Sequence, residues 1–224
     1  MKRLLILDCD GTLVDSEPAS NRALHAWVRQ LGLDISLEES TRMLTGLSVS
    51  TTGEILRERG LELPADWEQQ IHDCEIRAVS HGIKPVTGIE NVLANAVGFG
   101  YQLATATNAP AAKAQTSLPA SGLAAKFPQL LENLFSAEQV ARPKPAPDLL
   151  HLVCETLQVP PEECILLEDS LAGIRAGAEA GIQTFGLVGH VSRTMIQHAG
   201  AIPVESFREV IPVLRSHRQL HIEA

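Results

Sequence analysis

Two aspartates one residue apart end an apolar run near the start of the chain. Residues 4–13 read LLILDCDGTL, so Asp8 and Asp10 follow four apolar residues and precede Gly11. Alternate residues of a strand share a face, so both carboxylates point the same way while Cys9 points away. Like charges held this close resist ionisation. The pair therefore indicates either a cation between the carboxylates or a use of both groups in chemistry.

A covalent mechanism explains so tight a pair better than a metal alone. One carboxylate would attack as a nucleophile and form an acyl-phosphate, and the other would protonate the leaving oxygen and then take a proton from water. With Asp169 added, the hard oxygen ligands suffice for Mg²⁺. Lys144 offers an ammonium to a phosphoryl oxygen, a contact worth about 4 kcal/mol at ~4 Å near a protein surface. The Thr107 hydroxyl can supply a neutral donor.

These side chains need a scaffold that brings distant loops together. Residues 3–8, 101–106 and 164–167 read as buried strands, and helical patterns lie between them. This alternation predicts a parallel sheet with helices on both faces, in which ligands bind beyond the carboxyl ends of the strands. The loops expected to converge there carry Asp8 and Asp10, Thr107 and Asn108, Lys144, and Glu168 and Asp169.

A helical block interrupts this alternation after the first strand. Ser16 is expected to cap a first helix that Gly32 ends, and residues 38–44, 48–59 and 66–80 read as further helices. No strand signal lies between them, and residues 83–88 read as a linker. The block is therefore interpreted as a second domain inserted into the α/β core.

Composition limits the partners of this chain. Its 224 residues are 45% apolar and carry a net charge of −9, which argues against nucleic acid or an anionic membrane as the main partner. The four cysteines show no C-x-x-C spacing and read as reduced thiols, and no run approaches the ~18 apolar residues of a membrane span. We expect a cytoplasmic protein with a small-molecule partner, and nothing indicates an obligate protein partner.

Four stretches carry a family resemblance. LLILDCDGTLVDSE, ATATN, RPKPAPD and LLEDSLAGIRAGAEAG resemble, in order and spacing, the motifs of the haloacid dehalogenase superfamily of phosphohydrolases. They are most similar to its branch of sugar-phosphate phosphatases and beta-phosphoglucomutases. The resemblance implies an α/β fold with a Rossmann-like core, formed by residues 1–15 and 86–224, and an inserted helical cap formed by residues 16–85. The dehalogenases of the family lack an aspartate at the position of Asp10, so the chain groups with the phosphate-processing members.

The resemblance also implies roles for the motif residues. Asp8 would be the nucleophile and Asp10 the acid/base, while Thr107, Asn108 and Lys144 would hold the phosphoryl group. The implied Mg²⁺ ligands are Asp8, the main-chain carbonyl of Asp10, Asp169 and, directly or beside the metal, Glu168. We expect a Mg²⁺-dependent phosphatase that hydrolyses a small phosphorylated metabolite, a sugar or polyol phosphate, through an aspartyl-phosphate.

Two alternatives stay open at this point: a phosphomutase and a non-catalytic protein that binds a phosphorylated metabolite. The mutases that the chain resembles grip a second phosphate with an arginine ahead of a cap glycine. Here Thr45 precedes Gly46, although Arg42 and Arg57 flank the stretch. Specificity is expected in cap loops such as residues 46–50.

Overall fold

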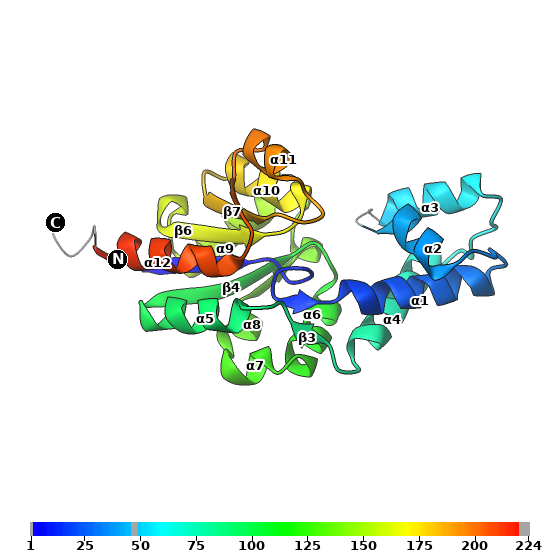
Figure 1. The fold of residues 1–224 in the computed structure, drawn as a ribbon, viewed down its shortest axis with the longest axis horizontal. Coiled ribbons are helices and arrows are strands. Elements are labelled where there is room, and N and C mark those ends of the chain that lie inside the picture. The colour runs from blue at the N-terminus through cyan, green and yellow to red at the C-terminus, as the bar shows by residue number, and fades with distance from the viewer. Residues whose placement is uncertain (1, 46–48, 220–224) are drawn as a thin grey trace.

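The core of the protein is a six-stranded sheet with the strand order β5-β4-β1-β6-β7-β8. The structure is a computed structural model and describes residues 2–45 and 49–219. All neighbouring strands of this sheet pair in parallel, as predicted, with β1 in the interior (Figure 1). Their bounds are β1 Arg3–Leu7, β4 Tyr101–Thr107, β5 Leu134–Ser136, β6 Cys164–Glu168, β7 Gln183–Leu187 and β8 Ile202–Val204.

Helices cover both faces of this sheet, because side chains of β1 alternate between two apolar layers. Leu5 and Leu7 pack with α5 (Ile89–Gly98), α6 (Ala111–Ala120), the short helices α7 (Leu123–Lys126) and α8 (Gln129–Glu132), and α12 (Ile211–Gln219). Leu4 and Ile6 pack with α9 (Asp148–Leu157) and α10 (Leu171–Glu179). All four side chains are fully buried, so the strand is a rigid base for the residues that follow it.

Four helices form a separate lobe beside the sheet, which we call the cap (Figure 1). They are α1 (Glu17–Gln30), α2 (Leu37–Leu44), α3 (Val49–Glu58) and α4 (Trp67–Val79). The cap has its own apolar cluster around Trp27, Leu56 and Trp67. The helical block is thus confirmed from Glu17 on, except that Ser48 lies outside the described residues. The exact division into domains stays a prediction.

The crossings between cap and core are tied together by a two-stranded sheet. β2 (Val14–Asp15) pairs antiparallel with β3 (Lys84–Pro85), so the segment predicted as a linker contains a short strand. Ser16 stands at the N-cap position of α1, as predicted, but its side chain makes no cap bond.

Two short elements near the end of the core were not predicted. They are α11 (Arg193–His198) and β8, which together complete the β7 edge of the sheet. Six helical residues and three strand residues are too few to give a clear periodicity. Over the described ranges, no helix is both long enough and apolar enough to cross a membrane.

Candidate active site

A buried lysine joins two of the predicted loops at the carboxyl edge of the sheet. Lys144 Nζ donates a hydrogen bond to Asp8 Oδ1 at 2.7 Å and another to Glu168 Oε1 at 2.8 Å. The lysine side chain is only 2% exposed. Burial alone would lower the pKa of Lys144, but the two carboxylates hold it above its ordinary value. The ammonium therefore stays charged beside the carboxylate that ends β1.

Glu168 uses both carboxylate oxygens in the protein itself. Its Oε2 accepts hydrogen bonds from the backbone N–H of Asp169 at 3.0 Å and from the N–H and hydroxyl of Ser170 at 2.7 and 2.8 Å. A Cβ at Gly173 would overlap the Glu168 carboxylate, so glycine is required there for close packing. These contacts make Glu168 an anchor for Lys144. Ser170 also caps α10 by accepting from the Gly173 N–H at 3.0 Å.

Asn108 and Thr107 lie at the end of β4, beside the Lys144 loop. The Asn108 amide donates to the Lys144 carbonyl at 2.8 Å and accepts from the Lys144 N–H at 3.1 Å. Its side chain is thus committed to holding the loop, which contains the cis peptide bond before Pro145. Thr107 is 2% exposed, and its hydroxyl oxygen accepts from the Ala109 N–H at 3.1 Å. That bond leaves the Thr107 hydroxyl hydrogen for an anionic ligand.

Asp8 is buried and Asp169 is half-buried, and the pKa of each carboxyl is raised above its ordinary value. Burial raises the pKa of Asp8 well above its ordinary value, Lys144 opposes the shift, and the charges of the neighbouring acids add to it. Burial and the charge of Glu168 raise the pKa of Asp169 to about 7. A divalent cation between Asp8 and Asp169 would relieve this repulsion.

The surroundings of Asp169 also fix its position. Thr12 donates a hydrogen bond to Asp169 Oδ1 at 2.9 Å. Gly11 has a positive φ of +78°, and a Cβ at this position would overlap the Asp169 carboxylate. The loop after β1 therefore passes directly over Asp169.

The residues near Asp8 suit a Mg²⁺ site in which the protein supplies only one or two side-chain ligands. Within residues 2–45 and 49–219, no three carboxylate, imidazole or thiol side chains gather in a metal-binding cluster. Mg²⁺ is usually held by one or two carboxylates, with water and substrate phosphate completing its shell. Asp8 and Asp169 fit that pattern, whereas Glu168 is engaged elsewhere.

Asp10 has a partner that the sequence did not indicate. Lys113 Nζ on α6 lies 3.4 Å from Asp10 Oδ1 and 3.5 Å from Glu75 Oε1 on the cap helix α4. The lysine side chain is 9% exposed. Burial alone would lower the pKa of Lys113, but the two acids hold it above its ordinary value. The only signal in the sequence is that Lys113 falls on the buried stripe of α6 with Ala114 and Ser117.

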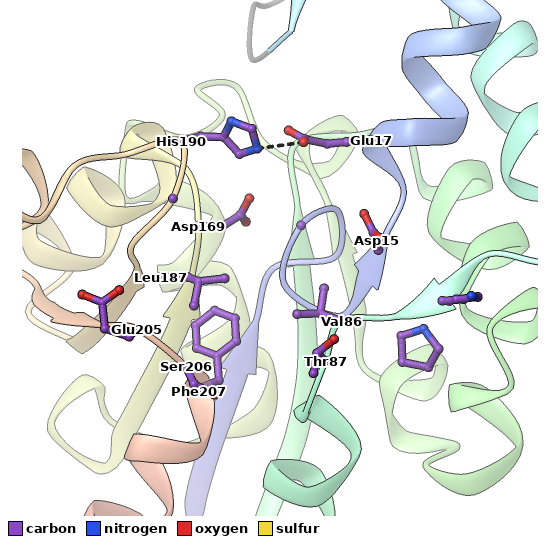
Figure 2. Close-up of a pocket in the computed structure, with 14 residues that line it drawn as sticks. Asp15, Glu17, Val86, Thr87, Asp169, Leu187, His190, Glu205, Ser206 and Phe207 are labelled. Atoms are coloured by element: carbon purple, nitrogen blue, oxygen red, sulfur yellow. Dashed lines mark ion pairs between the residues drawn. The ribbon is translucent and has the colours of Figure 1, made fainter. Parts of the chain in front are cut away.

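Two cavities flank the loop that carries these aspartates. A cavity of about 240 Å³ between cap and core is lined by Asp10, Asn21, Glu75 and Lys113, among others, and we call it the cap cavity. A larger cavity of about 540 Å³ includes Asp169 but not Asp8 or Asp10. Figure 2 shows Asp169 in this larger cavity, near an ion pair of 2.8 Å between Glu17 Oε2 and His190 Nε2. The cap cavity is the one that faces the predicted acid/base.

The protein is a parallel sheet with a helical cap, and a buried lysine contacts the carboxylate that ends the central strand. Together these features define a capped α/β enzyme. The family model described as haloacid dehalogenase-like hydrolase matches residues 5–187. The chain belongs to this family and is an enzyme of its phosphatase type.

The chain is similar to several proteins of the family whose names state an activity or a ligand. The chain is 32% identical over 181 residues to hexitol phosphatase A of Escherichia coli, covering 79% of this chain and 78% of the relative. It is 28% identical over 183 residues to 6-phosphogluconate phosphatase of the same organism, covering 81% and 80%. A crystal structure of CbbY from Rhodobacter sphaeroides with xylulose-(1,5)bisphosphate matches with a TM-score of 0.77 at 28% identity, covering 94% and 96%.

Proposed function

We propose that this protein is a Mg²⁺-dependent phosphatase that hydrolyses a sugar or polyol phosphate through an aspartyl-phosphate on Asp8. The observation that carries the proposal is the buried contact between Lys144 and Asp8 at the end of β1. A lysine in this place can neutralise a phosphoryl group bound to the aspartate, and phosphoryl transfer depends mostly on such positioning and charge.

The first step is attack by an Asp8 carboxylate oxygen on phosphorus, which breaks the bond to the leaving oxygen. Asp10 gives its proton to that oxygen, and the alcohol leaves through the cap cavity that Asp10 lines. Lys144 and the Thr107 hydroxyl stabilise the charge on the phosphoryl oxygens. In the second step Asp10 takes a proton from water, which attacks phosphorus and releases phosphate and the free Asp8 carboxylate.

The carboxylates of Asp8 and Asp169 and the main-chain carbonyl of Asp10 would hold Mg²⁺. When bound, the ion supplies positive charge to the phosphoryl oxygens. Glu168 acts on the reaction through Lys144, which it fixes against Asp8.

The cap favours hydrolysis over phosphate relocation. Thr45 donates its hydroxyl hydrogen to Asn21 Oδ1 at 3.0 Å. Arg57 is stacked over the Trp67 ring at 5.2 Å, and Arg42 is exposed to solvent. Neither arginine is among the described residues that line the cap cavity. The cavity as described therefore has no guanidinium to bind a second phosphate, as the cap arginine of a mutase does. Residues 46–48 of the expected specificity loop lie outside the described residues.

The non-catalytic alternative explains fewer features. A protein that only binds a phosphorylated metabolite needs Lys144 and donors for the phosphate. It does not need a second carboxylate at Asp10 that faces a cavity beside the phosphate site.

A panel of phosphorylated metabolites, scored by release of free phosphate with Mg²⁺, tests the proposal. We expect turnover of sugar or polyol phosphates by the native enzyme and by Asp34→Asn, because Asp34 is almost fully exposed on the cap. Asp8→Asn should stop turnover while the fold persists. Retention of more than about a tenth of the activity by Asp8→Asn would rule out a covalent role for Asp8.

A second experiment tests whether the enzyme is a phosphomutase. The enzyme is incubated with beta-glucose 1-phosphate, Mg²⁺ and a trace of the 1,6-bisphosphate, and the products are followed by phosphorus NMR. We expect free phosphate. Glucose 6-phosphate formed faster than free phosphate would favour the mutase.

A further inference from the structure

We propose that the cap cavity selects a neutral polyhydroxylated leaving group, an alditol or uncharged sugar with one phosphate, over an ester that carries a second anionic group. This inference rests on the proposed phosphatase function and narrows its substrate class. It comes from the charges that line the cap cavity.

The described lining of the cap cavity is acidic. It contains the carboxylates of Asp10, Glu17 and Glu75 and a single ammonium, that of Lys113. The ammonium lies between two of these acids, 3.4 Å from Asp10 and 3.5 Å from Glu75. Residues 46–48 are Gly, Leu and Ser and add no charge by type. A carboxylate or second phosphate in this cavity would meet no cation that is free of a partner acid.

Protonation of Asp10 does not change this conclusion. If Asp10 carries a proton when the ester binds, Lys113 remains paired with Glu75. Like charges brought together in a site oppose binding, which discriminates between otherwise similar ligands.

The neutral groups of the cap cavity suit hydroxyls. Ser20 Oγ is buried and has no hydrogen-bond partner among the described residues. Ser20 lines the cavity, and a ligand hydroxyl would satisfy its Oγ once the side chain turns toward the ligand. Asn21 receives the Thr45 hydroxyl on Oδ1, which leaves its Nδ2 hydrogens outside that bond. Both side chains come from α1, so they lie on the cap side of the cavity.

The size of the cap cavity agrees with a small ligand. Its volume of about 240 Å³ lies below the roughly 300–1,000 Å³ of sites for drug-sized molecules. Overall identity does not separate the candidate substrates, because the chain is 32% identical to a hexitol phosphatase and 28% identical to a 6-phosphogluconate phosphatase. The charges of the lining do separate them.

Glucitol 6-phosphate and 6-phosphogluconate form a matched pair for the test. They share the phosphate and the chain of hydroxyls, and they differ at the far carbon, which is a CH₂OH group in one and a carboxylate in the other. We expect kcat/KM for glucitol 6-phosphate to be at least about tenfold higher, with most of the difference in KM. Equal rates, or a preference for 6-phosphogluconate, would overturn the inference.

Glu75→Gln tests whether the charges of the cap cavity cause the preference. This variant frees part of the Lys113 charge, so the ratio of kcat/KM values should fall at least about threefold. Glu68→Gln, an exposed site on the same helix, should leave the ratio unchanged. A preference that Glu75→Gln does not alter would contradict the assignment to this cavity.

Two further arms separate this inference from the phosphatase proposal. Turnover of p-nitrophenyl phosphate reports the chemistry at Asp8 with little demand on the cap cavity, so its absence would count against the phosphatase itself. Calorimetric binding of both esters to Asp8→Asn measures selectivity without turnover. Tighter binding of glucitol 6-phosphate supports the inference, and equal or weaker binding contradicts it.

Discussion

At the scale of single residues, the site depends on two buried lysines that each hold a pair of acids. Lys144 lies between Asp8 and Glu168 within the core, and Lys113 lies between Asp10 of the core and Glu75 of the cap. Each ammonium offsets the repulsion between the two acids that it joins. The two aspartates of the first motif therefore have different partners.

Asp10→Asn tests the acid/base assignment. We expect release of the alcohol in the first turnover to slow by roughly 10²–10⁴-fold for a sugar phosphate, because the leaving alkoxide needs a proton. The loss should be smaller for p-nitrophenyl phosphate, whose leaving group is a weak base. Rapid-quench measurement of the released alcohol gives both rates. An equal loss for the two esters would indicate that Asp10 acts on something other than the leaving oxygen.

Glu168→Gln tests the anchor of Lys144. The amide cannot accept all the hydrogen bonds that reach Glu168 Oε2, and it leaves Lys144 with one acid. Removing one partner of a buried ion pair costs roughly 3–5 kcal/mol, so the free energy of unfolding in denaturant should fall by about this amount. Adding Lys144→Met should recover part of the loss. If the double variant is no more stable than the sum of the single effects predicts, the two residues do not act as one unit.

At the scale of elements, the strands β1, β4 and β6 and the loops that follow them were predictable from the sequence. The four apolar residues before Asp8 and those before Glu168 are long enough to mark buried strands, and parallel strands bring their carboxyl ends to one edge. The contact between Lys113 and Glu75 was not predictable. It depends on how α4 packs against α6, and helical periodicity gives the buried face of a helix without naming its neighbour. The use of Glu168 as an anchor depends in the same way on Lys144, 24 residues earlier.

The loop over Asp169 predicts a pH-dependent response to Mg²⁺. The pKa of Asp169 rises from its ordinary 3.8 to about 7. In metal-free protein the folded state therefore loses stability as the pH increases from about 3.8 to about 7, because the unfolded chain ionises this carboxyl first. If Mg²⁺ binds the ionised carboxylate, it stabilises the folded state. We expect the rise in Tm on adding Mg²⁺ to be larger near pH 8 than near pH 5.5.

Differential scanning fluorimetry at both pH values measures this response. Asp169→Asn should remove most of the Mg²⁺ effect at both, whereas Asp34→Asn should retain it. A Mg²⁺ effect that is independent of pH would show that the ion does not compete with a proton on Asp169.

At the scale of the whole molecule, the cap is joined to the core by two crossings that β2 and β3 pair side by side. A lobe held in this way can close over the cap cavity to exclude water and open to release product. We expect the cap angle to differ between free crystals and crystals with a bound phosphate analogue, with the change located near residues 15–17 and 83–88. The same cap placement in several free and liganded crystals and in solution scattering would contradict this expectation.

The interior position of β1 in the sheet also has a consequence during synthesis on the ribosome. This strand is made before its partners β4 and β6, which follow about 100 and 160 residues later, as the pairs Arg3–Tyr101 and Leu4–Cys164 show. At roughly 5–20 residues per second, the ribosome leaves the apolar strand without its second neighbour for on the order of 10–30 s. A chaperone that recognises extended apolar segments should therefore crosslink to residues 3–7 in arrested chains of about 120 residues and lose this contact in the released protein.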